Sequence, residues 1–175
     1  MNPLLTHFTS RDLALPRAPS PLLTNISVTA ALKAFLGSLA AQFAVSPVAP
    51  ALVVATPAGQ LHELGAVMIN AVAAQLGWRI AYLGVSLPAA EIAGAAVQSK
   101  AVAVALSIVY PEDDPNLPQE LASLRRFLPP GVKILSGGRA AAAYGETLAR
   151  IGAIQPADLD AFSQELDALR KRPQA

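Results

Sequence analysis

From about residue 51 onward, the chain alternates between two patterns of apolar positions. Short runs rich in Val, Ile, Leu and Ala are separated by longer Ala-rich stretches whose apolar residues recur at three- and four-residue steps. The short runs predict strands and the longer stretches predict helices. Strands are expected over Ala51 to Thr56, Arg79 to Leu83, Ala101 to Val109, Lys133 to Ser136 and Ala153 to Ile154. Helices are expected over His62 to Leu76, Pro88 to Gln98, Leu117 to Phe127, Ala140 to Ile151 and Pro156 to Arg170, the third opened by a capping box of Asn116 and Gln119.

The predicted strands lack polar alternation, which indicates that helices cover both faces of their sheet. Five βα units of this size predict an α/β fold, a doubly wound five-stranded parallel sheet of the flavodoxin-like, Rossmann type. In that topology ligands bind beyond the carboxyl ends of the strands, next to the point where the strand order reverses. Residues that follow the first, third and fourth strands are therefore expected to share one crevice.

The first 50 residues follow a different pattern. Residues 1–25 contain four prolines and no sustained period, and they predict a flexible N-terminal arm. Residues 26–46 predict an amphipathic helix with Leu32, Phe35, Leu36, Leu39 and Phe43 on its apolar face. Lys33 and Gln42 interrupt the apolar stretch, so we expect neither an export signal nor a membrane span here, and a cytoplasmic location.

Composition narrows the possible chemistry. The 175 residues include 13 basic and 12 acidic side chains, a formal charge of +1 that argues against direct nucleic-acid binding. The absence of cysteine excludes disulfides, thiolate metal ligands and thiol nucleophiles. His7 and His62 are the two histidines, so chemistry that needs an imidazole depends on one of them.

Three short motifs follow three strands that should be neighbours. His62-Glu63-Leu64-Gly65 follows the first strand, with Gln60 two residues before the histidine. Ser107-Ile108-Val109 ends the third strand, and Gly137-Gly138 ends the fourth. A histidine at such an edge can offer a ring nitrogen to a metal, and glycines leave room for a ligand against the backbone. A serine between them can hydrogen-bond a polar ligand atom.

These motifs and their separations of 41 and 27 residues resemble the cobalamin-binding family, whose pattern is Asp-x-His-x-x-Gly, Ser-x-Leu and Gly-Gly. Stretches such as Leu106 to Pro111 and Gly137 to Ala140 look most like the C-terminal sensory domain of MerR-type, light-responsive cobalamin regulators. The resemblance implies a cobalamin-binding domain over residues 51–172. It also implies that residues 26–46 are a remnant of the helical bundle that precedes this domain in the family.

The resemblance implies a role for each residue. His62 would be the lower axial ligand of cobalt, oriented by Gln60, while the nucleotide tail of cobalamin inserts into the sheet. Ser107 would contact the base of that tail, and Gly65, Gly137 and Gly138 would form the wall of its channel. The implied cofactor-binding residues are Gln60, His62, Glu63, Leu64, Gly65, Ser107, Val109, Tyr110, Gly137 and Gly138. His7 is a second, weaker candidate as upper ligand.

The sequence departs from the family in several ways. Before the sheet we expect neither a winged-helix DNA-binding domain nor a complete four-helix bundle, and Ile26 to Leu32 lacks the family's Trp and Glu-His pair. We expect Trp78 to be a packing residue instead. Gln60 stands where a carboxylate is expected, and an amide orients a ring but does not titrate, which argues against a methyl carrier.

Together these features predict a non-catalytic, light- or cobalamin-sensing protein. We expect it to act through a homo-oligomer or a transcription regulator, and to have neither DNA nor a membrane as a direct partner. The upper ligand of cobalt stays open. Two alternatives remain: a corrinoid carrier subunit of a methyltransferase or mutase, and a haem-binding or ligand-free interaction domain on the same scaffold.

Overall fold

The computed structural model describes residues 30–31, 34–35, 38 and 45–171. The predicted arm over residues 1–25 and His7 lie outside the described residues. Most of the predicted helix over residues 26–46 also lies outside them, and its described residues from 30 to 38 are helical.

Four parallel strands form one sheet, β1 (Ala51–Pro57), β2 (Arg79–Leu87), β3 (Ala101–Ser107) and β4 (Lys133–Gly137). Their spatial order is β2-β1-β3-β4, all pairs being parallel. This is the expected doubly wound order, and it places β1, β3 and β4 side by side. Every residue of β1 is buried, as a central strand covered on both faces requires.

The expected fifth strand is wrong. Ile154 makes a single parallel bridge to Leu135, and this bridge does not extend into a strand in the described part of the chain. Gly152 has a φ of +68°, which turns the backbone just before the bridge. Pro156 follows two residues later without an N–H to donate, so only a short extended segment fits between them.

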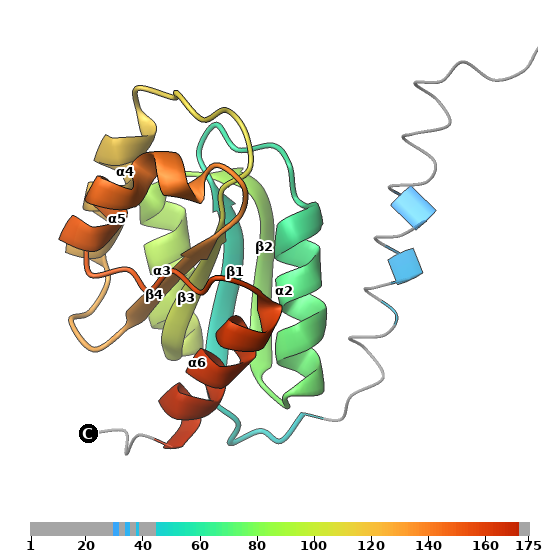
Figure 1. Ribbon diagram of the computed structural model, residues 1–175. Coiled ribbons are helices and arrows are strands. Elements are labelled where there is room, and N and C mark those ends of the chain that lie inside the picture. Colours follow the sequence, from blue (N-terminus) through green and yellow to red (C-terminus); the bar gives the residue numbers. More distant parts are fainter. Residues whose placement is uncertain (1–29, 32–33, 36–37, 39–44, 172–175) are drawn as a thin grey trace, which may run out of the picture.

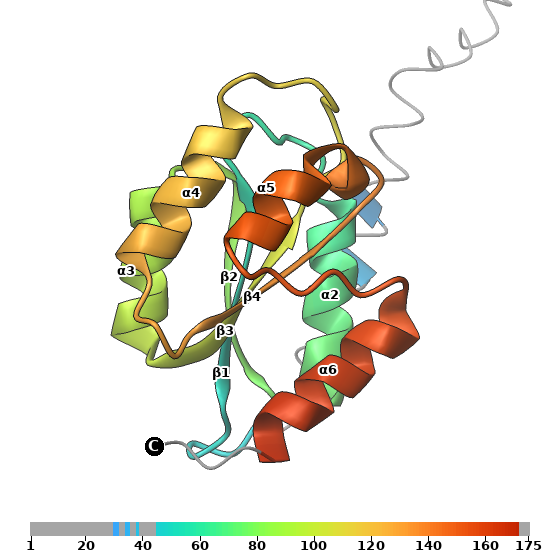
Figure 2. The ribbon, with the colours of Figure 1, turned by 60° about the vertical axis from the view of Figure 1, so that its left-hand side comes forward.

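Helices cover both faces of the sheet (Figures 1 and 2). One face carries α2 (Leu64–Gln75) and α6 (Leu159–Lys171), and the other carries α3 (Ala89–Ser99), α4 (Leu117–Phe127) and α5 (Gly145–Arg150). Within the described residues, none of these helices is long and apolar enough to span a bilayer.

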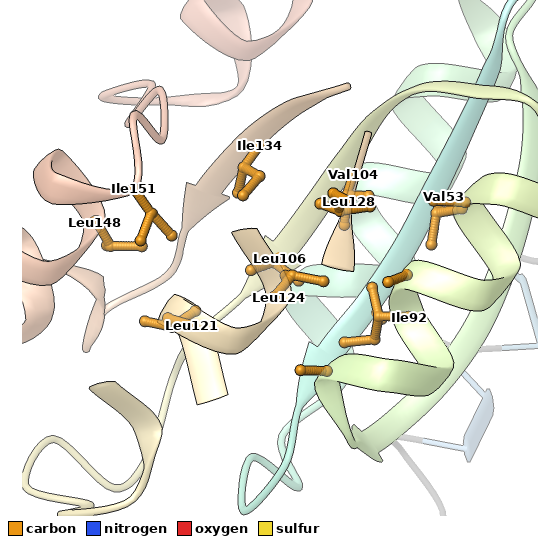
Figure 3. Close-up of a cluster of buried hydrophobic side chains, with 14 of the residues drawn as sticks. Val53, Ile92, Val104, Leu106, Leu121, Leu124, Leu128, Ile134, Leu148 and Ile151 are labelled. Atoms are coloured by element: carbon orange, nitrogen blue, oxygen red, sulfur yellow. The ribbon is translucent and has the colours of Figure 1, made fainter. Parts of the chain in front are cut away.

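Each face has its own apolar core. Val53 and Leu106 pack with α3 and α4 residues such as Ile92 and Leu124, as Figure 3 shows. On the opposite face, Leu52 and Val54 pack with residues of α2 and α6. Successive residues of β1 therefore contribute to alternate cores, which explains why the strand reads as an uninterrupted apolar run.

Trp78 belongs to the core beneath α2 and α6, which confirms its predicted packing role. It is fully buried, and the Arg170 guanidinium lies 5.9 Å from the centre of its ring. Arg170 also donates a hydrogen bond to the carbonyl of Leu76. These contacts join the end of α6 to the loop that follows α2.

Element boundaries differ from the prediction in several places. β3 ends at Ser107 and not at Val109, and α6 begins at Leu159 and not at Pro156. α2 begins at Leu64, so His62 lies in the loop before the helix. β2 continues to Leu87 through register shifts around Gly84 (φ +96°) and Ser86 (φ +55°), where the sequence suggested a strand end at Leu83.

The predicted helix over residues 140–151 is divided. A 3₁₀ turn, η1 (Ala141–Tyr144), precedes α5, and the break falls at Tyr144, whose φ of −105° and ψ of 14° lie outside the helical region.

The expected capping box at α4 is also wrong. The Asn116 side chain makes no capping hydrogen bond, and the backbone N–H of Asn116 instead donates to the Asp114 carboxylate at 2.9 Å.

Candidate functional site

A mostly apolar cavity lies beside the carboxyl ends of β3 and β4, on the α2 and α6 face. Its volume is about 170 Å³. We call it the tail pocket. It is lined by residues from both strand ends, the first turns of α2, and the segment that enters α6: Gly65, Met68, Ile69, Ala105, Leu106, Ser107, Leu135, Ser136, Gly137, Gly138, Pro156, Ala157, Asp158, Leu159 and Phe162.

Ser107 supplies the hydroxyl that faces this cavity. It ends β3 beside Gly137 of β4, and its side chain points toward α2, since a Cβ built on Gly65 would lie 2.5 Å from its Oγ. The residue is 1% exposed, and its Oγ has no hydrogen-bond partner. A buried hydroxyl without a partner is costly, so this atom is available to a ligand.

Glycine is required at two places around the pocket. Gly138 has a φ of +107°, and a Cβ there would lie 2.9 Å from the carbonyl carbon of Ile108 and closer still to its oxygen. A Cβ on Gly65 would meet the Ser107 hydroxyl. Gly137 differs, because a Cβ on it would meet nothing within 4 Å. Its side-chain position opens into free space beside the pocket.

His62 lies in the exposed loop between β1 and α2, three residues before Gly65. The next residue, Glu63, is anchored, because its carboxylate accepts a 2.8 Å hydrogen bond from the Tyr82 hydroxyl of β2. Burial raises the pKa of Tyr82 well above its usual value, and the Glu63 carboxylate raises it further. Tyr82 therefore remains a neutral donor that ties this loop to the sheet.

Gln60 does not have the partner that the resemblance implied. Its side chain is fully buried and bonds three consecutive residues of the loop after β3, not the imidazole. The ring of His62 instead meets the ring of Tyr110, edge to face, at 5.7 Å between centroids. Tyr110 is 56% exposed beside His62 at the mouth of the site.

The predicted residues fall into two groups. Gly65, Ser107, Gly137 and Gly138 line the tail pocket. The others form the two loops beside it: Gln60, His62 and Glu63 before α2, and Val109 and Tyr110 after β3. Leu64, the first residue of α2, is half-buried between the two groups.

Sequence reasoning missed the apolar lining of the pocket. Met68 and Ile69 lie three and four residues after Gly65, a spacing that places them on the same face of α2 and was readable from the sequence. Phe162 comes from α6, whose position depends on packing over the whole face of the sheet. Nothing near Phe162 in the sequence marks it as a pocket residue.

Ser136 is a second buried serine whose hydroxyl has no partner. Ile134 and Leu135 belong to opposite cores, so strand alternation places the Ser136 side chain on the Ile134 face, away from the pocket. Ser136 is nevertheless one of the residues that line the pocket, which is consistent with a contribution from its backbone.

Comparison with known proteins places this geometry in a family. Residues 50–161 match the B12 binding domain. The chain belongs to this family. A stretch of 79 residues is also 37% identical to the HTH-type transcriptional repressor CarA of Myxococcus xanthus, covering 45% of this chain and 26% of the repressor. The resemblance to cobalamin-dependent regulators is thus confirmed, and the chain spans about a quarter of that relative's length.

Two solved structures share the fold of this B12-binding domain. The monomethylamine corrinoid protein of Methanosarcina barkeri aligns with a TM-score of 0.65 and 18% identity, covering 84% of this chain and 69% of that one. A cobalamin-binding protein of Desulfitobacterium hafniense DCB-2 aligns with a TM-score of 0.58 and 18% identity, covering 70% and 60%. Cobalamin is therefore the cofactor of the domain.

The residues present fit this cofactor. The tail pocket is apolar, as burial of a flat heteroaromatic base requires, and Ser107 offers the base a hydrogen bond that no protein group satisfies. Gly137, whose Cβ position is free, lets a ligand approach the β4 backbone. The exposed imidazole of His62 is a suitable ligand for cobalt.

Proposed function

We propose that the domain binds cobalamin with its nucleotide tail in the tail pocket and with His62 as the lower axial ligand of cobalt. The observation that carries the proposal is the unpaired hydroxyl of Ser107 inside an apolar cavity that begins three residues from His62. A ligand with a planar base and a metal in one molecule would fill the cavity, satisfy the hydroxyl and offer the imidazole a partner. Cobalamin has both.

When bound, the cofactor supplies a cobalt centre with an exchangeable upper ligand. The chain contributes the remaining functions. Ser107 hydrogen-bonds the base, the glycines admit it, and the apolar side chains of Met68 and Phe162 exclude water from it. His62 is held in a loop that Glu63 and Tyr82 anchor to the sheet.

The biological role we propose is sensory rather than catalytic. The support is the 37% identity over 79 residues with part of a transcriptional repressor. A formal charge of +1 gives the chain no strong field for nucleic acid, so the domain acts on a protein partner, either a second copy or a regulator. If light is the signal, the bound cofactor would supply the photosensitive cobalt centre, and the chain would supply the surface on which the partner docks.

A corrinoid carrier of a methyltransferase is the second candidate, because the monomethylamine corrinoid protein has this fold. Transfer of the methyl group from the methylcobalamin-loaded protein to a thiol or corrinoid acceptor would favour that function over sensing.

The proposal is tested by mixing the purified full chain with hydroxo-, methyl- and adenosylcobalamin and recording absorption spectra in darkness and after illumination. We expect stoichiometric binding and a spectrum of cobalt ligated by a protein imidazole. His62→Ala should retain cobalamin through the tail pocket and show cobalt without the histidine. His7→Ala tests the other imidazole in the same way.

Unchanged spectra for His62→Ala would overturn the proposed ligation. Size-exclusion chromatography of the same samples tests the sensory role, because a change in oligomeric state on illumination or on cobalamin binding is expected. An identical elution volume under all conditions would contradict signalling through a second copy.

A further inference from the structure

Gln60 holds the loop that follows β3. Its Oε1 accepts hydrogen bonds from the backbone N–H groups of Val109 and Tyr110, both at 2.9 Å. Its Nε2 donates to the carbonyl of Pro111 at 3.3 Å. Because the side chain is fully buried, water does not compete for these bonds, and they fix three consecutive backbone groups of the loop.

Two further hydroxyls, each with two hydrogen bonds, make this arrangement rigid. The Tyr144 hydroxyl donates to the same Pro111 carbonyl at 3.1 Å and accepts from the N–H of Asp114 at 2.8 Å. On the other side, the Thr56 hydroxyl donates to the carbonyl of Gln60 and accepts from the N–H of Ser86 at 2.8 Å. The Gln60 backbone is fixed by Thr56 at the end of β1, and its side chain binds a loop that Tyr144 of η1 also binds.

This loop carries the side chain that contacts His62. The Tyr110 and His62 rings lie 5.7 Å apart at an interplanar angle of 77°. Edge-to-face pairs of this kind favour one relative orientation over others. Since the Tyr110 backbone N–H is bonded to Gln60, the amide fixes the point from which this ring extends.

We propose that Gln60 is a positioning residue that acts on His62 through Tyr110: the amide fixes the loop, and the Tyr110 ring holds the imidazole in its cobalt-ligating orientation. The inference rests on the proposed function. Beyond the direct orienting role that the resemblance implied for Gln60, it adds Tyr110 as the group that contacts the imidazole. It also gives a physical reason for glutamine at this position. Its side chain is one methylene longer than that of aspartate and carries an N–H donor for Pro111, which a carboxylate lacks.

The test follows the nitrogen bound to cobalt. The full chain is produced with ¹⁵N-labelled histidine and loaded with unlabelled cob(II)alamin. Electron paramagnetic resonance then distinguishes a ¹⁵N ligand of the protein from the ¹⁴N base of the cofactor. Cobalamin retained after gel filtration and the unfolding temperature of the cofactor-free chain are measured on the same samples.

Four variants separate positioning from folding. Tyr110→Ala removes an exposed ring, whereas Tyr110→Phe keeps the ring and removes only its hydroxyl. Gln60→Met keeps the length of the side chain but removes all three hydrogen bonds. Phe127→Ala is the matched control, because Phe127 is also a surface aromatic, 52% exposed at the end of α4.

In Tyr110→Ala and Gln60→Met, we expect cobalamin to be retained while the ratio of ¹⁵N-ligated to unligated cobalt falls about 2- to 10-fold. Tyr110→Phe and Phe127→Ala should match the wild type. If Gln60→Met fails to fold, Tyr110→Ala against Tyr110→Phe still decides the step from Tyr110 to His62.

Equal ¹⁵N coupling in the wild type and in Tyr110→Ala would overturn the inference and leave the proposed function intact. A wild-type protein that retains cobalamin without ¹⁵N coupling would overturn the proposed ligation itself, and the positioning role with it.

Discussion

At the scale of single residues, Ser107 combines two properties that proteins seldom combine, full burial and an unpaired hydroxyl. Ser107→Ala removes that unsatisfied group, so we expect the cofactor-free chain to be stabilised by about 1 kcal/mol. The same change removes the hydrogen bond offered to the base, which should weaken cobalamin binding about 2- to 10-fold. Urea unfolding and cobalamin titration measure the two effects.

Ser136→Ala is the matched control for this prediction. Its hydroxyl is also buried and unpaired, but strand alternation turns it to the other face of β4. Ser136→Ala should stabilise the cofactor-free chain about as much as Ser107→Ala does, without changing cobalamin affinity. If Ser107→Ala instead lowered the free energy of unfolding by more than about 1 kcal/mol, the hydroxyl would have a structural role.

The paired glycines of β4 lead to a second prediction. Gly138→Ala should destabilise the cofactor-free chain by about 1 to 3 kcal/mol, because φ is +107° and the new Cβ would press on the Ile108 backbone. Gly137→Ala should change that stability by less than about 0.5 kcal/mol, since its Cβ meets nothing within 4 Å. By strand alternation this Cβ shares the Leu135 face and narrows the pocket, so cobalamin binding should weaken.

Thermal unfolding and cobalamin retention separate the two glycine variants. Loss of stability in Gly137→Ala, or full stability in Gly138→Ala, would contradict the geometry of this turn. Normal cobalamin affinity in a stable Gly137→Ala would show that the ligand does not lie against β4.

At the scale of elements, a helix or strand could be predicted from the sequence when its pattern of apolar residues was long and uniform. β1 and β3 were predicted because central parallel strands are apolar on both faces. Helices α3 and α4 were predicted because their apolar residues recur with an equally clear helical period. The segment around Ile154 has the right residues for a strand, but Gly152 and Pro156 leave it room for one bridge only. The backbone turn at Gly152 and the missing N–H of Pro156 therefore outweighed the strand propensity of the residues between them.

The same contrast explains the site. Gly65, Ser107, Gly137 and Gly138 were grouped correctly because parallel topology alone brings the carboxyl ends of β3 and β4 to the start of α2. The partners of Gln60 were not predictable, because they depend on the path of a nine-residue loop between β3 and α4 that no repeating pattern specifies. A motif locates a residue on the fold, whereas its hydrogen bonds depend on the loops.

At the scale of the whole molecule, the site has two separate parts. His62 and Tyr110 form an exposed pair at the mouth, while the tail pocket is built from both strand ends, α2 and α6. A single exposed imidazole would supply one bond to cobalt at a position that water can reach. The enclosed apolar cavity, in contrast, provides burial and a hydrogen bond that water in the pocket cannot fully replace.

Retention should therefore depend more on the tail pocket than on the cobalt ligand. Cobinamide, which lacks the nucleotide tail, should bind the wild-type chain at least about tenfold more weakly than cobalamin, a difference of about 1.4 kcal/mol or more. His62→Ala should lose less affinity for cobalamin than that, and Gly137→Ala should reduce the preference for cobalamin over cobinamide. Equilibrium titrations of both corrinoids against the three proteins measure these ratios. Equal affinities of the wild type for the two corrinoids would mean that the cavity between β4 and α6 does not receive the tail.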